Sequence, residues 1–178
     1  EVLGEPHRWV VNTNWKTGPM NFGADGPHAV KVHGPITMAT FKVPPATFRD
    51  ALVDSPAVSM GNGHNGIVTQ IPESLKGMVP PYFGFNPDLI ELYEQHLSPQ
   101  QSELNRHLLA GVQTMFPNFS SVQGAATFDP EAMPVNFLAI RVWQPVSATQ
   151  TEIWNWFLVE KEASEEWKKA AMLAGVRT

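Results

Sequence analysis

Hydrophobic and polar positions follow two different periods along this chain, and the change of period predicts where helices give way to strands. Residues 87–97 (PDLIELYEQHL) place their apolar side chains at helical spacing. Ser98 and Pro99 have the form of an N-cap and a first helical residue, so we expect a second helix that runs to about Met115. From Phe119 onward the apolar residues follow the period of β-strands.

The last third of the chain predicts an antiparallel sheet followed by a helix. Strands are expected at Phe119–Gly124, Phe137–Val146 and Thr151–Lys161, and the short SATQ segment between the last two predicts a hairpin. Ala163–Val176 carries an apolar stripe at helical spacing, and Ser164 is placed to cap its first turn.

The first two thirds predict short helices joined by proline-rich connections. In chain order we expect a strand at 8–12, helices at 15–24 and 27–33, an irregular segment at 35–60, a strand at 67–71 and a loop at 72–85. Gly34-Pro35 ends the second of these helices directly after His33. Helices early in the chain and an antiparallel sheet late in it define the fold class as α+β.

Composition narrows the possible functions. The 178 residues fit one domain, with 43% hydrophobic and 16% charged residues and no apolar run near the ~20 residues of a membrane span. The net charge of −5 and the scattered Lys and Arg argue against nucleic-acid binding. No cysteine is present, so any metal in the chain must bind to His, Asp, Glu or backbone oxygens. We expect a cytoplasmic location.

The segment NWKTGPMNFGADGPHAVKVH (14–33) carries the most informative polar residues. Asp25 and His28 are three apart, which puts them on adjacent positions of one helical turn. His28 and His33 are five apart, about 140° around an ideal helix, so both rings reach one point only if the helix widens or ends between them. Gly34-Pro35 favours the second possibility.

Each of these residues also has an ordinary structural interpretation. A single histidine is more often a packing or surface residue than a ligand. Asp25 by itself suits a helix N-cap better than a catalytic group. His64 in the turn GNGHNG is either a turn residue or a position at the rim of a site. The D-x-x-H-x-x-x-x-H pattern is therefore weak without its flanks.

The flanking residues make the pattern specific. N-W-K-x-x-x-x-N-F-x-x-D-x-x-H-x-x-x-x-H, read at 14–33, closely resembles the mononuclear iron motif of the Rieske-type aromatic-ring-hydroxylating dioxygenases, in the α subunit. The similarity continues through GNGH at 61–64, the Phe116-Pro117-Asn118 segment, and the strands with VWQP and FLVEK, so it covers the whole chain. Met20 stands where many members carry glutamate.

The resemblance implies roles for seven residues. His28 and His33 would be two ligands of a mononuclear non-haem Fe(II), and Asp25 would link His28 to the electron donor across a subunit boundary. Asn21 would lie close to the metal. Phe22 and Ala29 would face the substrate pocket, and Asn118, which follows Phe116-Pro117, is either a substrate-orienting residue or a turn residue.

The same resemblance implies a fold and a domain organisation. We expect a helix-grip (Bet v1-like) antiparallel sheet packed on a C-terminal helix, here truncated. Residues 1–178 would be a partial catalytic (mononuclear iron) domain, with the N-terminal Rieske domain and a C-terminal segment lying outside them. The third iron ligand of the family is an aspartate that would follow the last helix, and no acid after residue 163 matches it.

The implied function is O2-dependent hydroxylation of an aromatic substrate, as in aromatic hydrocarbon catabolism. Electrons would come from NAD(P)H through a reductase, with or without a ferredoxin, and then through a Rieske [2Fe–2S] centre in the N-terminal domain. We expect a homo-oligomer, with or without a β subunit, and no membrane or nucleic-acid partner. The 178 residues alone are expected to be inactive.

Two other functions are compatible with the residues themselves. One is a non-catalytic helix-grip module that binds an apolar ligand. The other is a zinc hydrolase that uses His28, His33 and a water, which is less favoured because zinc hydrolase helices place their histidines four apart with a glutamate between them.

Overall fold

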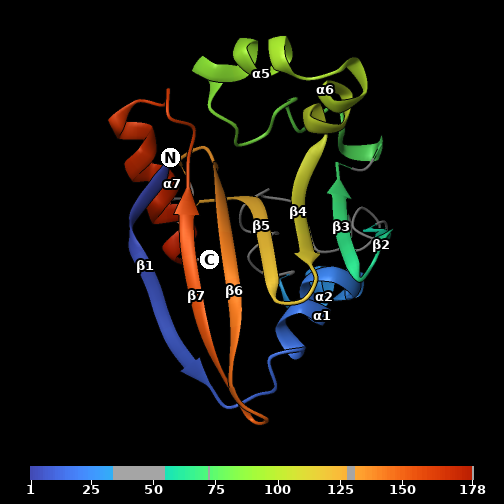
Figure 1. Cartoon of the computed structure of the whole chain (residues 1–178). Helices are drawn as coiled ribbons and strands as arrows, with labels where there is room; N and C mark the ends of the chain where they lie inside the picture. Colours follow the sequence, from blue (N-terminus) through green and yellow to red (C-terminus); the bar gives the residue numbers. More distant parts are fainter. Residues whose placement is uncertain (34–54, 72, 128–130, 178) are drawn as a thin grey trace.

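The protein is built on one antiparallel sheet of seven strands (Figure 1). The structure is a computed structural model, and it describes residues 1–33, 55–71, 73–127 and 131–177. Across the sheet the strand order is β1-β7-β6-β5-β4-β3-β2, with every neighbouring pair antiparallel. The strands are β1 (Val2–Val11), β2 (Ala57–Gly61), β3 (His64–Gln70), β4 (Leu108–Met115), β5 (Phe119–Ala126), β6 (Val135–Ser147) and β7 (Gln150–Leu158).

The hairpin predicted from the sequence is formed by β6 and β7, between the edge strand β1 and the middle strand β5. β6 and β7 pair from Leu138–Leu158 to Ser147–Gln150, so the SATQ segment makes the turn. Along β6 the buried residues Phe137, Ala139 and Trp143 alternate with half-buried neighbours, which is the period of two that a strand with one buried face requires.

The C-terminal helix α7 (Glu165–Arg177) packs on the inner face of this hairpin. Its Ala171 and Ala174 are 2% and 4% exposed. Gly175 allows the close approach, because a Cβ there would lie 2.5 Å from the ring of Phe157. Ser164 accepts a hydrogen bond from the N–H of Trp167, so it caps the helix as predicted. The expected helix-grip-like α+β fold is confirmed.

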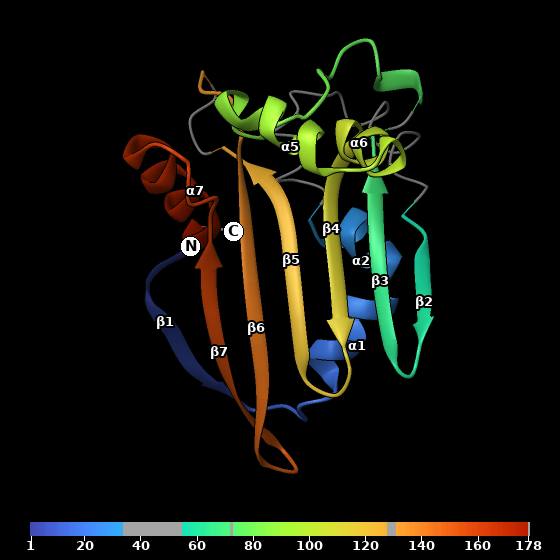
Figure 2. The same ribbon diagram turned by 45° about the horizontal axis from the view of Figure 1, so that its top comes forward.

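Helix α1 (Thr17–Ala24) covers the same face of the sheet as α7. Phe22 of α1 packs with Trp143 and Ile153, and Val122 contacts both this cluster and the cluster beneath α7. In Figure 2 both helices, together with α2 (Gly26–Val32), lie behind the sheet. At the end of the molecule opposite α1 and α2 lie η2 (Pro87–Leu89), α5 (Ile90–His96) and α6 (Pro99–Arg106).

Two predictions from the sequence are wrong. The helix that begins after Ser98 has the predicted cap, with reciprocal bonds between Ser98 and Gln101, but it ends at Arg106 and not near Met115. Residues 108–115 form β4, because they pair with β3 on one side and β5 on the other. Long-range pairing therefore overrides the helical pattern.

The second error concerns the segment predicted as irregular at 35–60. Its residues 57–61 form the edge strand β2, and positions 34–54 lie outside the described residues. The loop predicted at 72–85 is confirmed, because its described residues form turns and the short 3₁₀ helix η1 (Glu73–Leu75). There Leu75, Val79 and Phe83 form a buried cluster with Ile71.

Among the described residues no helix is long and apolar enough to span a membrane.

Candidate functional site

The predicted ligands lie at a sharp corner between α1 and α2. One residue, Asp25, separates the two helices, and its backbone (φ −103°, ψ 68°) leaves the helical region. Its carboxylate Oδ1 accepts a hydrogen bond from the N–H of His28 at 3.2 Å, which is the N-cap contact predicted for it. Gly26 follows without a side chain because a Cβ there would lie 2.5 Å from the carbonyl oxygen of Ser55.

The corner is fixed to the sheet by a chain of buried hydrogen bonds. Thr114 of β4 donates to the carbonyl oxygen of Pro19 in α1 at 2.8 Å, and its hydroxyl also lies 2.9 Å from that of Ser120 in β5. Trp143 of β6 donates from Nε1 to the same Ser120 hydroxyl at 2.9 Å. Three strands and the helix thus share one polar network, which holds the first turn of α1 against the sheet.

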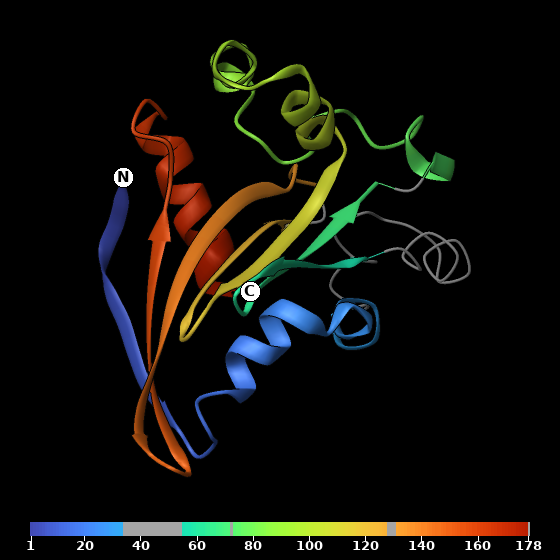
Figure 3. The ribbon, with the colours of Figure 1, turned by 45° about the vertical axis from the view of Figure 1, so that its right-hand side comes forward.

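The imidazole rings of His28 and His33 lie together at the end of α2. Their centroids are 5.0 Å apart and their planes are inclined by 67°. α2 ends at Val32, so His33 lies outside the helix and its ring can turn back toward His28. Figure 3 views this corner from the side, with α2 next to the end of α1.

The separation of the two rings fits ligation of one metal ion. With a metal–nitrogen distance of about 2.1 Å, each ring centroid lies roughly 3.3 Å from the ion, and two rings at tetrahedral or octahedral angles are about 4.7–5.4 Å apart. The observed 5.0 Å falls inside this range. Within the described residues no group of three or more His, Cys, Asp or Glu is arranged for a metal, and ligation by the His28–His33 pair stays a prediction.

The surroundings of His33 favour its neutral imidazole. Partial burial and, second, the nearby charge of His28 lower the pKa of His33. A neutral imidazole is the form that binds metals. Nδ1 of His28 lies 3.9 Å from Oδ2 of Asp25, within ion-pair range but beyond a direct hydrogen bond. The side chains of His28 and Asp25 are 29% and 52% exposed, so solvent reaches both.

The predicted substrate-facing residues have mixed surroundings. Phe22 is 9% exposed, and its ring packs edge-to-face against Trp143 at 5.4 Å. Asn21, one position earlier in α1, is half-buried. Ala29 belongs to α2, but its side chain lies outside the described ones. Phe22 is therefore a packing residue in this structure, and its contact with a substrate stays a prediction.

Asn118 and His64 both hold the main chain near the turn between β4 and β5. Asn118 donates from Nδ2 to the carbonyl oxygen of Trp143 at 3.3 Å, and Trp143 donates its N–H to the carbonyl oxygen of Asn118 at 2.9 Å. Nδ1 of His64 accepts the N–H of Phe116 at 3.1 Å. For His64 these contacts match the turn interpretation. A role of Asn118 in orienting substrate stays a prediction.

Arg141 is a polar residue of this face that the sequence analysis did not single out. It lies on β6, donates from Nε to the side-chain oxygen of Asn155 at 2.8 Å, and places its guanidinium 5.1 Å from the ring centroid of Phe22. Burial lowers the pKa of Arg141. The alternation Ala139, Arg141, Trp143 assigned it to the buried face, and that signal was available in the sequence.

The fold and the corner together define a class: a helix-grip-like α+β domain with two histidine rings in contact at the end of α2. No protein-family model matches the chain. In sequence, it is 29% identical to the N,N-dimethyl phenylurea N-demethylase subunit alpha of Sphingobium sp. (strain YBL2), over 98% of this chain and 38% of that protein. It is 24% identical to the naphthalene 1,2-dioxygenase large oxygenase component of Pseudomonas putida, over 95% and 36% of the two chains.

A solved structure shows the same likeness in three dimensions. Naphthalene 1,2-dioxygenase from Rhodococcus sp., with indole bound, superposes with a TM-score of 0.85 at 30% identity, over 100% of this chain and 39% of that one. The chain is therefore a relative of the large oxygenase components of aromatic-ring dioxygenase systems and corresponds to their catalytic portion, which confirms the resemblance carried by residues 14–33. It spans less than two fifths of the length of these relatives.

Proposed function

We propose that residues 1–178 form part of the mononuclear iron domain of an aromatic-ring-hydroxylating oxygenase, and that the whole protein carries out O2-dependent hydroxylation of an aromatic substrate. The observation that carries this proposal is the His28–His33 pair, whose ring separation of 5.0 Å suits one shared metal ion. The pair lies in the positions of the family's motif, directly after Asp25.

His28 and His33 would hold Fe(II), and an aspartate outside the described residues would complete the set of two histidines and one carboxylate. When bound, the iron supplies the oxygen chemistry, with open positions for O2. The contribution of this chain is to hold the two imidazoles at the right separation, with that of His33 neutral. The lowered pKa of His33 supports that role because protonation would compete with metal binding.

Asp25 would position His28 and connect it to the electron donor. Its Oδ1 caps α2 at the His28 N–H, which leaves Oδ2 on the side of the imidazole, 3.9 Å from Nδ1. A small rotation of either side chain would bring these atoms to hydrogen-bond distance, and a ligating histidine needs its second nitrogen oriented in this way. Asp25 is half exposed, so a neighbouring subunit has access to it.

The aromatic substrate would bind on the inner side of the corner. Asn21 would lie close to the metal, and Phe22, Ala29 and Asn118 would line the pocket. Phe22 supports this placement because it joins the corner to the apolar cluster around Trp143. An apolar lining with few polar groups suits a flat ring that is held by its shape.

The remaining parts of the proposed enzyme lie outside this chain. They are a Rieske [2Fe–2S] domain, a reductase that uses NAD(P)H and, in some arrangements, a ferredoxin and a β subunit. The names of the relatives support a multicomponent system, since they are described as an oxygenase component of a dioxygenase system and as a subunit alpha. We further propose a homo-oligomer in the cytoplasm, in which Asp25 lies at a subunit boundary.

The test is iron binding by the full-length protein that contains this chain. His28→Ala and His33→Ala should each reduce the iron content per protomer at least about tenfold and abolish substrate-dependent O2 uptake. His96→Ala, a histidine of α5 at the other end of the molecule, is the matched control and should keep both. Normal iron content in His28→Ala would overturn the proposal. The non-catalytic module would be favoured by a wild-type protein that binds aromatic compounds without iron and shows no turnover when iron is supplied.

A further inference from the structure

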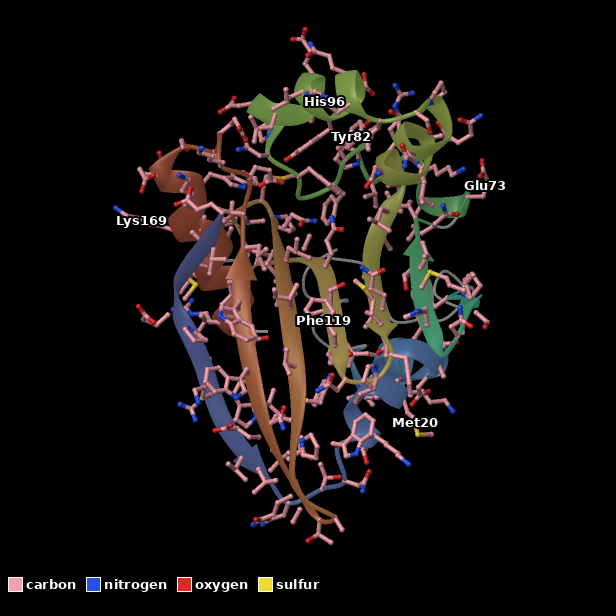
Figure 4. All side chains as sticks on the ribbon, in the orientation of Figure 1. Met20, Glu73, Tyr82, His96, Phe119 and Lys169 are labelled. Atoms are coloured by element: carbon pink, nitrogen blue, oxygen red, sulfur yellow. The ribbon has the colours of Figure 1, made fainter. Side chains whose placement is uncertain are left out.

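A separate cavity of about 350 Å³ lies beneath α5. It opens to solvent on one side and is lined by α5, the segment before η2, the end of α6, and the connection between β7 and α7. Its lining shares no residue with the candidate metal site. Figure 4 shows Tyr82 and His96 of this cavity at one end of the molecule and Met20 of α1 at the other. The lining residues are Tyr82, Phe85, Leu92, Tyr93, His96, Leu97, Asn105, Glu160 and Glu162.

Three aromatic rings form walls of this cavity. Phe85 is inclined by 80° to Tyr82 and by 75° to Tyr93, with ring centroids 5.8 Å apart in both pairs. These edge-to-face contacts hold the three rings at steep angles to one another. Tyr82 has φ 56°, a left-handed backbone conformation that bulky residues rarely adopt, and its N–H bonds to the carbonyl oxygen of Arg106 at 3.0 Å. The position of this ring is thus fixed by contacts on several sides.

The charged groups of the cavity are acidic. Glu160 and Glu162 both line it, and within the described residues neither forms an ion pair with a lysine or arginine. The Tyr93 hydroxyl donates to Oε1 of Glu160 at 2.6 Å. Burial and this contact raise the pKa of Tyr93, so the hydroxyl keeps its proton and holds Glu160 in one orientation. The second carboxylate oxygen is left for another donor.

The neighbouring carboxylate Glu94 is different because its charge is already matched. Arg106 bonds to Oε1 of Glu94, and the Tyr82 hydroxyl donates to the same oxygen at 2.9 Å. This contact also holds the Tyr82 ring on its side of the cavity. A ligand in the cavity could therefore balance the negative charges of Glu160 and Glu162.

We infer that this cavity binds a small organic cation, of the alkylammonium or quaternary ammonium class. The faces of Tyr and Phe rings attract cations, and such ligands are recognised by sets of aromatic side chains that surround them. The carboxylates add the opposite charge at the edge of the same space. The volume lies near the lower limit of small-molecule sites, which suits a ligand of a few carbon atoms and excludes a large ring system.

A neutral aromatic ligand fits the same space less well. It would cover Glu160 and Glu162 without supplying a charge or a hydrogen-bond donor, and burial of an unmatched carboxylate is unfavourable. Comparison of a cation with its neutral analogue therefore separates the two possibilities. The inference does not rest on the iron site, because no residue of the corner contributes to the cavity.

The experiment is a calorimetric titration of the full chain with choline and with its uncharged analogue, in which carbon replaces the quaternary nitrogen. Choline should bind in the millimolar range, and the neutral analogue about tenfold or more weakly. Glu162→Gln and Phe85→Leu should each weaken choline binding about fivefold or more. Glu166→Gln, an exposed acid in the first turn of α7 outside the cavity, is the matched control and should bind choline as the wild type does.

Three outcomes would overturn the inference. These are equal affinity for choline and the neutral analogue, no binding of choline by correctly folded protein, and unchanged choline affinity in both Glu162→Gln and Phe85→Leu. Circular dichroism of each variant guards against misfolding. Should Phe85→Leu fail to fold, Glu162→Gln still decides the result because Glu162 is exposed and belongs to a connection between elements.

Discussion

The β6–β7–α7 unit and the α1–α2 corner hold their shapes by different means. The first is a long paired hairpin under a helix, and its three elements follow one another directly in sequence. The corner has two short helices of eight and seven residues, which are marginal alone. It depends on contacts from distant strands, above all Trp143 with Phe22 and Thr114 with Pro19. The geometry of the candidate site therefore depends on contacts with the sheet.

The largest expected effect comes from Trp143→Ala, which removes the contact that the two regions share. Loss of this buried ring should cost about 3–5 kcal/mol in the free energy of unfolding. Its bond to Ser120 and its packing against Phe22 are lost together, so iron should be lost as well. Urea unfolding and iron analysis of the full-length protein measure both.

Trp154→Ala is the matched control on the same hairpin. Trp154 is half-buried on the opposite face, where it stacks on Trp156 and lies beneath Arg8. Trp154→Ala should destabilise the protein markedly less than Trp143→Ala and leave the iron content unchanged. Equal loss of iron in the two variants would show that the corner does not depend on Trp143 in particular.

Two glycine substitutions should separate the regions. Gly175→Ala pushes α7 away from Phe157 and should destabilise the fold by about 1–3 kcal/mol while the folded protein keeps its iron. Gly26→Ala places a Cβ against the carbonyl oxygen of Ser55 and should displace the corner, with a loss of iron affinity of about tenfold or more. Thermal unfolding and iron titration give the two readouts. If both variants change only the stability, or both change only the iron affinity, the two regions do not hold their shapes by different means.

Asp25 distinguishes capping from electron transfer within the corner. Asp25→Ala should cost about 1 kcal/mol of stability because the His28 N–H loses its acceptor. Asp25→Asn keeps a capping oxygen and should keep stability and iron content. Single-turnover kinetics of the full-length enzyme should nevertheless show slow electron delivery to the iron in Asp25→Asn. Wild-type turnover in that variant would reduce Asp25 to a cap.

The smallest effect is expected at Glu152, on β7 next to the edge strand β1. A hydrogen bond from Arg8 and a second from Trp154 lower the pKa of this carboxyl. The folded protein therefore binds fewer protons at Glu152 than the unfolded chain, so the contribution is present above the ordinary carboxyl pKa of about 4.5 and lost as the pH falls through the folded pKa.

Glu152→Gln should thus slightly lower the melting temperature at neutral pH and leave it unchanged in acid. High salt should reduce even the neutral difference, because Arg8 and Glu152 are partly exposed. A difference that grows in acid would contradict the assigned sign. Neither condition should alter iron content, since β1 and β7 carry no residue of the corner.

Contacts between residues close in sequence were predicted correctly, and contacts between distant segments were not. The 147–150 turn, the Ser98–Gln101 cap and the Ser164 cap were predicted correctly because neighbouring residues alone make those contacts. β4 was taken for the end of a helix, since nothing between Arg106 and Leu108 interrupts the pattern in the way a proline would. Only its partners β3 and β5 decide that this segment is extended.

The candidate site divides in the same way. The motif at 14–33 identified the histidines, and Gly34-Pro35 indicated why residues five apart can meet. Phe22 and Asn118 were assigned to substrate, but the structure gives them packing and main-chain contacts that depend on Trp143, more than 20 residues further along. Arg141 was missed because its significance lies in what faces it across the sheet–helix interface.

The sequence by itself determined the caps, the hairpin and the ligand types of the site, because these depend on side-chain chemistry and on spacing over a few residues. The tertiary structure decided which face of each strand is buried beneath α1 and α7, how closely the rings of His28 and His33 approach, and that Tyr82, Phe85 and Tyr93 enclose a cavity with Glu160. Those features arise from packing between elements far apart in the chain, and no local pattern of residues encodes such a distance.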